Sequence, residues 1–287
     1  MTYTVEPSVK DDNVVAIRHS VTDDSRFSYL LVSDVHWDSP HCNRQLLKQH
    51  FDEAVSRGAG IISVGDWFDA MQGRDDRRHQ KGDVRPELGV DDYLDQLVEQ
   101  SAEWLGPYAD HIVFLADGNH ETSVRKKLET DLTGRLSRRI GAHRMGYSGF
   151  VQFRFEKIAP AGTRGGRITK NMYFHHGSGG GGPVTKGVIQ TNRRAVYLPD
   201  ADLVVSGHIH EWYQVSQPRI RLLTNGRTCT DEQIHLCLGT YKDETDLFGG
   251  WHTERSAPPK PLGGTWLTWE YQNTRQPSVK MEVMRAQ

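Results

Sequence analysis

The sequence has no excess of charge of either sign. It contains 35 basic and 37 acidic residues in a chain of 287, which gives a formal net charge of −2 at pH 7. A chain this close to neutrality has no global electrostatic attraction to nucleic acid or to an anionic membrane, although it can still carry a local basic groove. The overall charge therefore does not indicate a class of binding partner.

Cysteine and long apolar runs are also scarce. Cys42, Cys229 and Cys237 are odd in number, widely spaced and without C-x-x-C spacing, so the sequence indicates a reducing compartment and excludes a disulfide framework or a zinc finger. The first residues, "MTYTVEPSVKDDNVV", lack the basic and apolar regions of a signal peptide, and no apolar run approaches the length of a membrane span. We expect a cytoplasmic protein without a membrane partner.

Short apolar segments and helical stripes alternate in the first half of the chain. The apolar segments are 27–33, 60–65 and 111–117, and their continuous apolar character is typical of strands buried on both faces. Apolar residues at helical spacing predict a helix over 43–58 that ends at Gly58, a second over 94–105, and a third from Val124 to Ile140. This alternation indicates βαβ units and a parallel sheet.

After Gly149 the pattern changes to a series of short strands, which predicts a second, more antiparallel sheet. The expected strands are 150–156, 170–176, 202–206, 211–216, 234–239, 265–271 and 279–284. No linker-like change in composition divides the halves, so we predict one domain over 1–287 with two packed sheets. Two long loops, 71–89 and 241–264, are either functional or poorly ordered.

Polar clusters follow successive predicted strands, and this is the chemically informative feature of the sequence. The clusters are "SDVHWDS" with Asp34 and His36, "GDWFD" with Asp66 and Asp69, "GNHE" with Asn119 and His120, "YFHHG" with His175 and His176, and "GHIH" with His208 and His210. In open parallel sheets, ligands gather at the carboxyl ends of the strands. We therefore expect these side chains to converge on one place.

Each cluster alone has a simpler explanation as a turn, a helix cap or polar surface. Their coincidence at successive strand ends makes that explanation improbable for the whole set. The candidate ligands are two carboxylates, one amide oxygen and four imidazoles, with no thiolate, and this mixture suits Mn²⁺, Fe, Zn²⁺ or Co²⁺ better than Ca²⁺ or Cu(I). Such a set exceeds the needs of one tetrahedral ion and fits two ions that share a carboxylate.

The order D-x-H, G-D-x-x-D, G-N-H-E, H-H-G and G-H-x-H over residues 34–210 resembles the calcineurin-like metallophosphoesterase superfamily. The motifs span about three-fifths of the chain. The resemblance implies a mixed α/β fold, a four-layer α/β/β/α sandwich of two mixed sheets flanked by helices. The segment "HHGSGGGGPVTKGVIQTNRRA" resembles phosphoesterases often encoded by phages and prophages, which implies the cytoplasm of a bacterium or a phage-infected host.

The resemblance also implies two divalent metal ions, with Mn²⁺ expected first and Fe or Zn²⁺ as alternatives. One metal would be held by Asp34, His36 and His210 and the other by Asn119, His176 and His208, with Asp66 bridging both. His176 is preferred to His175 because it directly precedes Gly177, as in relatives whose motif reads His-Gly. Because neighbouring side chains on a strand point to opposite faces, His175 is then expected to pack beside the ligands or to face the substrate.

The activity implied is hydrolysis of a phosphate ester by a hydroxide that bridges the metals. His120 would protonate the leaving oxygen or steady the transition state, and Asp69 would orient His120. Helix capping is the alternative explanation for both side chains. Within "TNRRAVYLP", Asn192, Arg193 or Arg194 could bind a phosphate oxygen in bidentate fashion, with solvated surface as the alternative.

Several functional alternatives stay open at the level of sequence. A phosphodiester substrate, nucleotide or nucleic acid, is favoured over a phosphoprotein. A nuclease of the same superfamily and a protein phosphatase are alternatives, and a non-catalytic scaffold is disfavoured because every ligand motif is intact. The arginines of loop 71–89 and the stretch "FGGWHTER" (248–255) either border the site or are solvated surface.

Overall fold

The structure is a computed structural model that describes residues 3–70, 84–158, 165–180, 185, 187–223, 225–245, 256 and 258–286. Residues 71–83 of the predicted loop 71–89 and residues 246–255 and 257 of the predicted loop 241–264 lie outside these residues. The stretch 248–255 and the arginines of loop 71–89 that precede residue 84 also lie outside them. Their predicted contribution to the site therefore stays a prediction.

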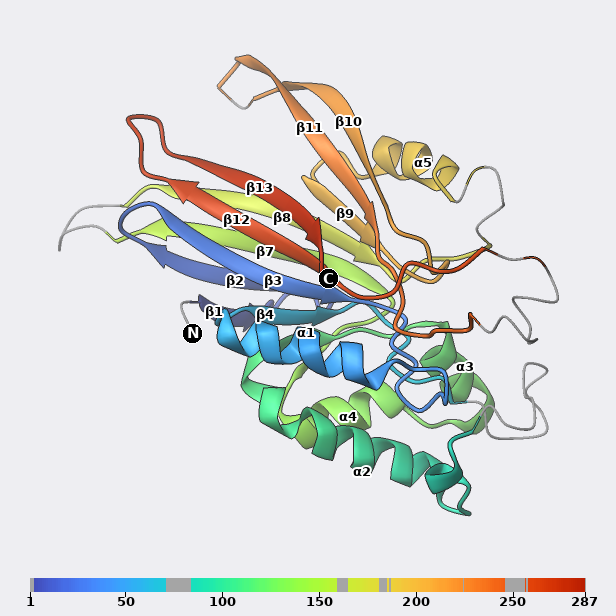
Figure 1. Cartoon of the computed structure of the whole chain (residues 1–287). Coiled ribbons are helices and arrows are strands. Elements are labelled where there is room, and N and C mark those ends of the chain that lie inside the picture. The colour runs from blue at the N-terminus through green and yellow to red at the C-terminus, as the bar shows by residue number, and fades with distance from the viewer. Residues whose placement is uncertain are drawn as a thin grey trace.

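One of two mixed β-sheets contains the parallel strands that the first half of the sequence predicts (Figure 1). Its order is β13-β12-β3-β4-β5-β6. The bounds are β3 Ser25–Val32, β4 Gly60–Ser63, β5 Ile112–Leu115, β6 His143–Arg144, β12 Thr265–Gln272 and β13 Ser278–Arg285. Strands β3 to β6 are parallel, which confirms the βαβ prediction, and β12 and β13 extend the sheet in antiparallel fashion.

The other sheet has the order β1-β2-β7-β8-β9-β11-β10. The bounds are β1 Tyr3–Pro7, β2 Val14–Val21, β7 Ser148–Lys157, β8 Arg167–His175, β9 Leu203–Ser206, β10 Tyr213–Leu222 and β11 Thr228–Cys237. Its pairs are both antiparallel, as in β7–β8, and parallel, as in β2–β7 and β8–β9. The carboxyl ends of β8 and β9 therefore lie side by side.

Two strands at each end of the chain are placed differently from the expectation. The sequence predicts that every strand after Gly149 joins the second sheet, but β12 and β13 pair with β3 in the first sheet, where Trp269 becomes fully buried. The unpredicted strands β1 and β2 take places in the second sheet instead. In β2, Val15, Ile17 and Val21 are fully buried at the period of two that is typical of a strand.

Aromatic side chains from both sheets fill the space between them. His19 is fully buried there, its ring stacks on Phe155 at 4.6 Å between centroids, and its Nε2 lies 2.7 Å from the hydroxyl of Tyr29. Phe153 packs on Trp269 across the same interface, at 5.2 Å between centroids. The two sheets therefore share one apolar core.

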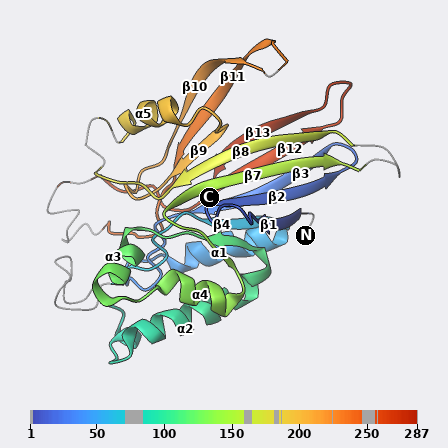
Figure 2. The same cartoon turned by 180° about the vertical axis from the view of Figure 1, so that it is seen from behind.

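Helices cover the outer faces of the sheets, which confirms the predicted sandwich of two mixed sheets flanked by helices (Figures 1 and 2). Helices α1 (Arg44–Ser56), α2 (Tyr93–Leu105) and α4 (Leu132–Ile140) lie over the sheet that contains β4. Helix α5 (Ile189–Tyr197), which the sequence does not predict, lies beside β9 and β10. Among the helices of the described residues, none has both the length and the apolar character that a membrane span requires.

The third predicted helix is wrong in its continuity. The segment from Val124 to Ile140 is divided between α3 (Asn119–Leu128) and α4, because Glu129 adopts a left-handed backbone with φ of 52°. Asp131 then caps α4, and its Oδ1 accepts a hydrogen bond of 3.0 Å from the backbone N–H of Gly134. The apolar residues at steps of four thus continue across the break between α3 and α4.

The cap gives a prediction about stability. Replacing Asp131 by alanine removes the acceptor of the Gly134 N–H and the carboxylate that lies 3.3 Å from Arg144, so we expect the free energy of unfolding to fall by about 1–2 kcal/mol. Urea denaturation followed by circular dichroism measures the loss. Asp131→Asn keeps the capping oxygen and should retain most of the stability. An equal loss in both variants would assign the effect to the ion pair rather than to the cap.

Candidate metal centre

The five sequence motifs lie at the carboxyl ends of five strands, three in one sheet and two in the other. Asp34 follows β3, Asp66 follows β4 and Asn119 follows β5, all of which are parallel neighbours. His176 follows β8 and His208 follows β9, which are parallel neighbours in the second sheet. The structure therefore brings the candidate ligands together from both sheets, as the sequence predicts.

The backbone is strained at these positions. Eight non-glycine residues of the described chain have positive φ, and five of them are predicted ligands: Asp34, His36, Asp66, His208 and His210. Left-handed backbone is disfavoured for a residue with a Cβ by about 1–2 kcal/mol, and it persists where surrounding contacts impose it. Here backbone hydrogen bonds of 3.1 Å join Asp34 N–H to the carbonyl of Gly65 and His36 N–H to that of Asp66. Such strain is typical of functional sites.

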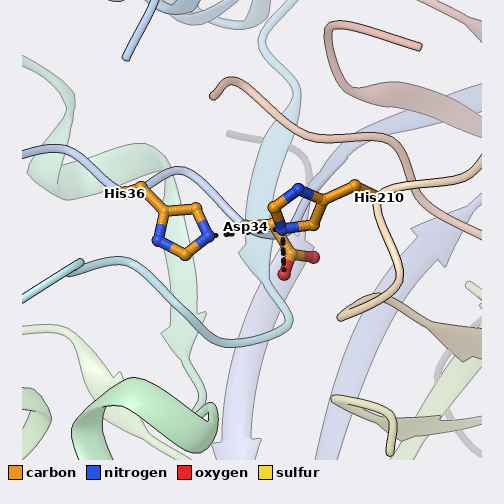
Figure 3. A group of neighbouring side chains, drawn as sticks. All are labelled: Asp34, His36 and His210. Atoms are coloured by element: carbon orange, nitrogen blue, oxygen red, sulfur yellow. Dashed lines mark hydrogen bonds and ion pairs between the residues drawn. The ribbon is translucent and has the colours of Figure 1, made fainter. Parts of the chain in front are cut away.

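The first group of donors is formed by Asp34, His36 and His210, whose ligand atoms lie within 4.8 Å of one another (Figure 3). His210 Nε2 is 3.3 Å from Asp34 Oδ1 and 3.4 Å from His36 Nε2. Asp34 Oδ2 accepts hydrogen bonds from Ser33 Oγ and from the backbone N–H of His208. Its Oδ1 is buried and has no hydrogen-bond partner among the described residues. One unbonded carboxylate oxygen that faces two imidazole nitrogens fits a divalent metal.

A second group is formed by Asp66, His176 and His208, also within 4.8 Å. His176 Nε2 lies 3.1 Å from Asp66 Oδ2 and 3.0 Å from Asn119 Oδ1, and His208 Nδ1 lies 2.6 Å from the same amide oxygen. The other ring nitrogen of His176, Nδ1, donates to the carbonyl of Val64 over 2.9 Å, so Nε2 is the nitrogen that faces the group and that would bind a metal in place of a proton. These donors match the predicted second ligand set.

Asp66 lies between the two groups. Besides its place with His176, it forms a third cluster with His36 and His120, again with ligand atoms within 4.8 Å. His36 in turn belongs to the first group. This position agrees with the bridging role that the resemblance implies for Asp66, and ligation itself stays a prediction.

The two adjacent histidines point in different directions. His176 is fully buried and belongs to the second donor group. His175 instead accepts a hydrogen bond on Nδ1 from the backbone N–H of Gly177, and both rings pack edge-on against Tyr147, at 5.2 Å and 5.3 Å between centroids. The structure thus places His176 among the donors and His175 beside them.

The carboxylates of the site are held ionised by the imidazoles around them. Burial opposes their ionisation, but His210 and His176 outweigh it and lower the pKa of Asp34 to about 2, and His176 and His120 lower the pKa of Asp66 well below its usual range. For His176, burial disfavours the charged ring, but Asp66 and Asp34 raise its pKa to about 10. Buried carboxylates need a neighbouring positive charge, which a proton or a divalent cation supplies.

The predicted partnership of His120 and Asp69 differs from the expectation in its atoms. His120 Nδ1 donates a hydrogen bond of 2.6 Å to the backbone carbonyl of Asp69, whereas its distance to the Asp69 carboxylate is 3.5 Å. The Asp69 carboxylate lies 2.8 Å from His36 Nδ1 instead. The main chain of Asp69 therefore orients His120, and its side chain orients a predicted ligand.

Three further polar side chains support the site without having been identified from the sequence. The Nζ of Lys242 lies 3.3 Å from the Asp69 carboxylate. Asp38 accepts hydrogen bonds from the backbone N–H groups of Asp69 and Ala70, and Glu121 accepts from those of Phe68, Gly118 and Asp66. Asp38 and Glu121 lie within the quoted motifs, which is a usable signal. Lys242 lies in the predicted loop 241–264, whose length is the only signal for it, because it reaches the site from a distant part of the sequence.

The predicted substrate contacts separate along α5. Asn192 is exposed, and its Oδ1 accepts a hydrogen bond of 2.8 Å from Gln217 on β10. Arg193 and Arg194 line a pocket of about 240 Å³. Asn192 does not belong to the lining of that pocket, and its role as a substrate contact stays a prediction.

No protein-family model and no curated protein matches the sequence. Similar solved structures include a conserved uncharacterized protein of Streptococcus pneumoniae described as a predicted phosphoesterase (11% identity, 91% of this chain and 90% of that chain, TM-score 0.33). They also include Vps29 of Entamoeba histolytica complexed with Zn²⁺ (10% identity, 90% and 99% coverage, TM-score 0.35). Vps29 of Chaetomium thermophilum is similar at 8% identity, with 90% and 98% coverage and a TM-score of 0.35. At these values the likenesses carry no argument about activity.

Proposed function

Because the chain has the two-sheet architecture and the motif order of the calcineurin-like metallophosphoesterases, we propose that it is a metal-dependent phosphoesterase that hydrolyses phosphodiesters. The observation that carries this proposal is the convergence of the predicted ligands from five strand ends into adjoining donor groups, linked by Asp66. Each polar cluster alone has a simpler explanation, but a turn or a cap does not require convergence. The cofactor we propose is a pair of divalent metals, Mn²⁺ first and Fe or Zn²⁺ as alternatives.

The residues that would hold the metals follow from the two donor groups. One metal would be held by Asp34, His36 and His210, the other by Asn119, His176 and His208, with Asp66 shared. When bound, the metals supply Lewis-acid activation of water and of the phosphoryl oxygens.

His120 has the geometry of an oriented proton donor. Its Nδ1–H is fixed on the carbonyl of Asp69, so a second proton must be held and released at Nε2. Nε2 faces the donor groups, at 3.8 Å from Asp66 Oδ2. Protonation of the leaving oxygen by His120 is therefore the acid step of the proposed reaction.

Hydrolysis of paired chromogenic substrates tests the proposal. We expect turnover of bis(p-nitrophenyl) phosphate in the presence of Mn²⁺, faster than that of p-nitrophenyl phosphate. Chelation should reduce both rates to background and added metal should restore them, because the Lewis acid is essential. A faster monoester reaction would favour a phosphomonoesterase, such as a protein phosphatase. Absence of turnover of either substrate by metal-loaded protein would contradict the proposed function.

A further inference from the structure

A pocket of about 240 Å³ lies next to the candidate metal centre and is absent from the predicted ligand scheme. Its walls include Gly177 and Gly207, the residues that directly follow His176 and directly precede His208. These two walls are in close contact, since a Cβ on Gly177 would lie 2.7 Å from the carbonyl oxygen of Gly207. A molecule bound in the pocket would therefore contact the direct chain neighbours of two predicted ligands, His176 and His208.

Arg194 lines this pocket as an almost fully buried cation without a counter-charge. Its exposed fraction is 9%. Within the part of the chain that the structure describes, no carboxylate lies at ion-pairing distance from it, and no acidic residue lines the pocket. Arg219 on the nearby strand β10, by contrast, forms an ion pair with Asp231 at 2.7 Å. Arg194 therefore lines the pocket without an ion-pair partner, and an anion in the pocket would supply the missing counter-charge.

The surroundings of Arg194 add to the positive potential rather than cancel it. Arg193 lines the same pocket and is exposed at its surface. His235, within the field of Arg194, is buried, and burial together with the charges of Arg194 and Arg219 lowers its pKa to about 4. His235 is therefore neutral near pH 7 and adds no charge beside Arg194. Glu211, which like Arg194 acts on Tyr213, is itself paired with Lys260 at 2.8 Å, so within the described residues neither guanidinium group has an ion-pair partner.

The remaining lining and the volume indicate the size of the anion. Thr185 and Gln190 contribute a hydroxyl and an amide, which can donate hydrogen bonds to oxygens, and Tyr213 and Ile209 form a less polar wall. Ile209 packs directly against the backbone of Gly187, where a Cβ would lie only 2.6 Å from Ile209 Cδ1. A volume of about 240 Å³ is below the range of about 300–1,000 Å³ for sites that enclose a whole drug-sized ligand. The pocket therefore suits a compact charged group.

We propose that this pocket, named here the Arg194 pocket, binds a second phosphoryl group of the substrate, distinct from the one that is hydrolysed. The substrate class is then a nucleotide or oligonucleotide with at least two phosphoryl groups. This inference rests on the proposed phosphoesterase function for the link to catalysis, but anion binding by the Arg194 pocket is independent of it. Arg194 supplies a planar, bidentate donor to the phosphoryl oxygens.

Anion binding is tested first, on full-length protein from which metal has been removed by chelation, so that phosphate cannot bind through metal. Inorganic phosphate should raise the melting temperature of this protein. Arg194→Met should abolish the rise, Arg194→Lys should keep part of it, and Arg227→Met, a control at an exposed arginine between β10 and β11, should keep all of it. An equal response of wild type and Arg194→Met would overturn the proposal.

Substrate preference is tested second, on metal-loaded protein. Wild type should hydrolyse the p-nitrophenyl ester of thymidine 5′-phosphate with a kcat/KM about tenfold or more higher when the nucleoside also carries a 3′-phosphate. This preference should disappear in Arg194→Met. If wild type showed no preference for the substrate with the 3′-phosphate, the link to catalysis would be overturned. This result does not depend on whether a variant folds. Absence of all turnover would contradict the proposed function instead, and the phosphate response of the metal-free protein would still decide the Arg194 pocket.

The two sources of a second phosphoryl group are distinguished by the same melting measurement. A nucleoside 3′,5′-bisphosphate and a short single-stranded oligonucleotide are compared with inorganic phosphate. A larger response to the bisphosphate assigns the pocket to small nucleotides, and a larger response to the oligonucleotide assigns it to a nucleic-acid strand. A response to neither, when wild type responds to inorganic phosphate, would overturn the substrate class.

Discussion

Replacing His120 by alanine is expected to lower kcat by about 10²- to 10⁴-fold while the protein keeps its bound metal. This is the range for the loss of a positioned proton donor. The structure supports that role because His120 Nδ1–H is fixed on the carbonyl of Asp69, 2.6 Å away, which leaves Nε2 to carry the transferable proton. The loss should be smallest for p-nitrophenyl esters and largest for alkyl esters, because a poor leaving group needs more proton transfer in the transition state.

Metal analysis decides between this role and ligation. His120 also belongs to a cluster with His36 and Asp66, so its geometry alone does not separate a proton donor from a ligand. Loss of metal from His120→Ala would make His120 a ligand and contradict the division of roles proposed above. His41→Ala, at an exposed histidine that follows the first motif, is the matched control and should leave both kcat and metal content unchanged.

Replacing Asp66 by asparagine is expected to lower both metal content and activity, the latter by more than about 100-fold. Substitutions that touch only the partners of metal ligands already weaken metal affinity or activity by about 10- to 100-fold. Asp66 lies between the two donor groups, with Oδ2 at 3.1 Å from His176 Nε2. Asparagine has the same shape and can still accept the backbone N–H of His120 at 2.9 Å, so the fold should survive.

Elemental analysis of the purified variant, together with kcat on bis(p-nitrophenyl) phosphate, measures the effect. Asp52→Asn, which changes an exposed carboxylate on α1, is the control for the general effect of removing one charge. An Asp66→Asn variant that retains the metal content and the rate of wild type would rule out Asp66 as a shared ligand. Loss of half the metal with partial activity would assign Asp66 to one donor group only.

Much of the fold could be predicted because its signals are local. Strands β3, β4 and β5 are short apolar runs, α1 has an apolar stripe and ends just before Gly58, and the parallel connections follow from their alternation. The break between α3 and α4 could not be read from the apolar period, because Val124 to Ile140 keeps its spacing across Glu129. Asp131, which caps α4, is the local signal from which the start of a new helix could have been predicted.

The allocation of strands to sheets required information that no local window contains. Strand β12 pairs with β3, so that Trp266 stands opposite Leu30 although more than two hundred residues separate them. Strand β2 pairs with β7 in the same way, which places Val15 opposite Val151 although more than one hundred residues separate them. Pairing is decided by which apolar faces can be buried together, and that depends on the whole chain.

For the candidate site, the sequence by itself determined the kinds of donor and their common location, because ligand type is carried by residue identity and the ends of parallel strands lie at one edge of the sheet. Only the tertiary structure decided which atoms meet. In the structure, His176 rather than His175 lies among the donors, and the Asp69 carboxylate contacts His36. Arg194 is almost fully buried and has no ion-pair partner among the described residues. Burial and side-chain direction depend on contacts between distant segments, which exist only once both sheets are packed together.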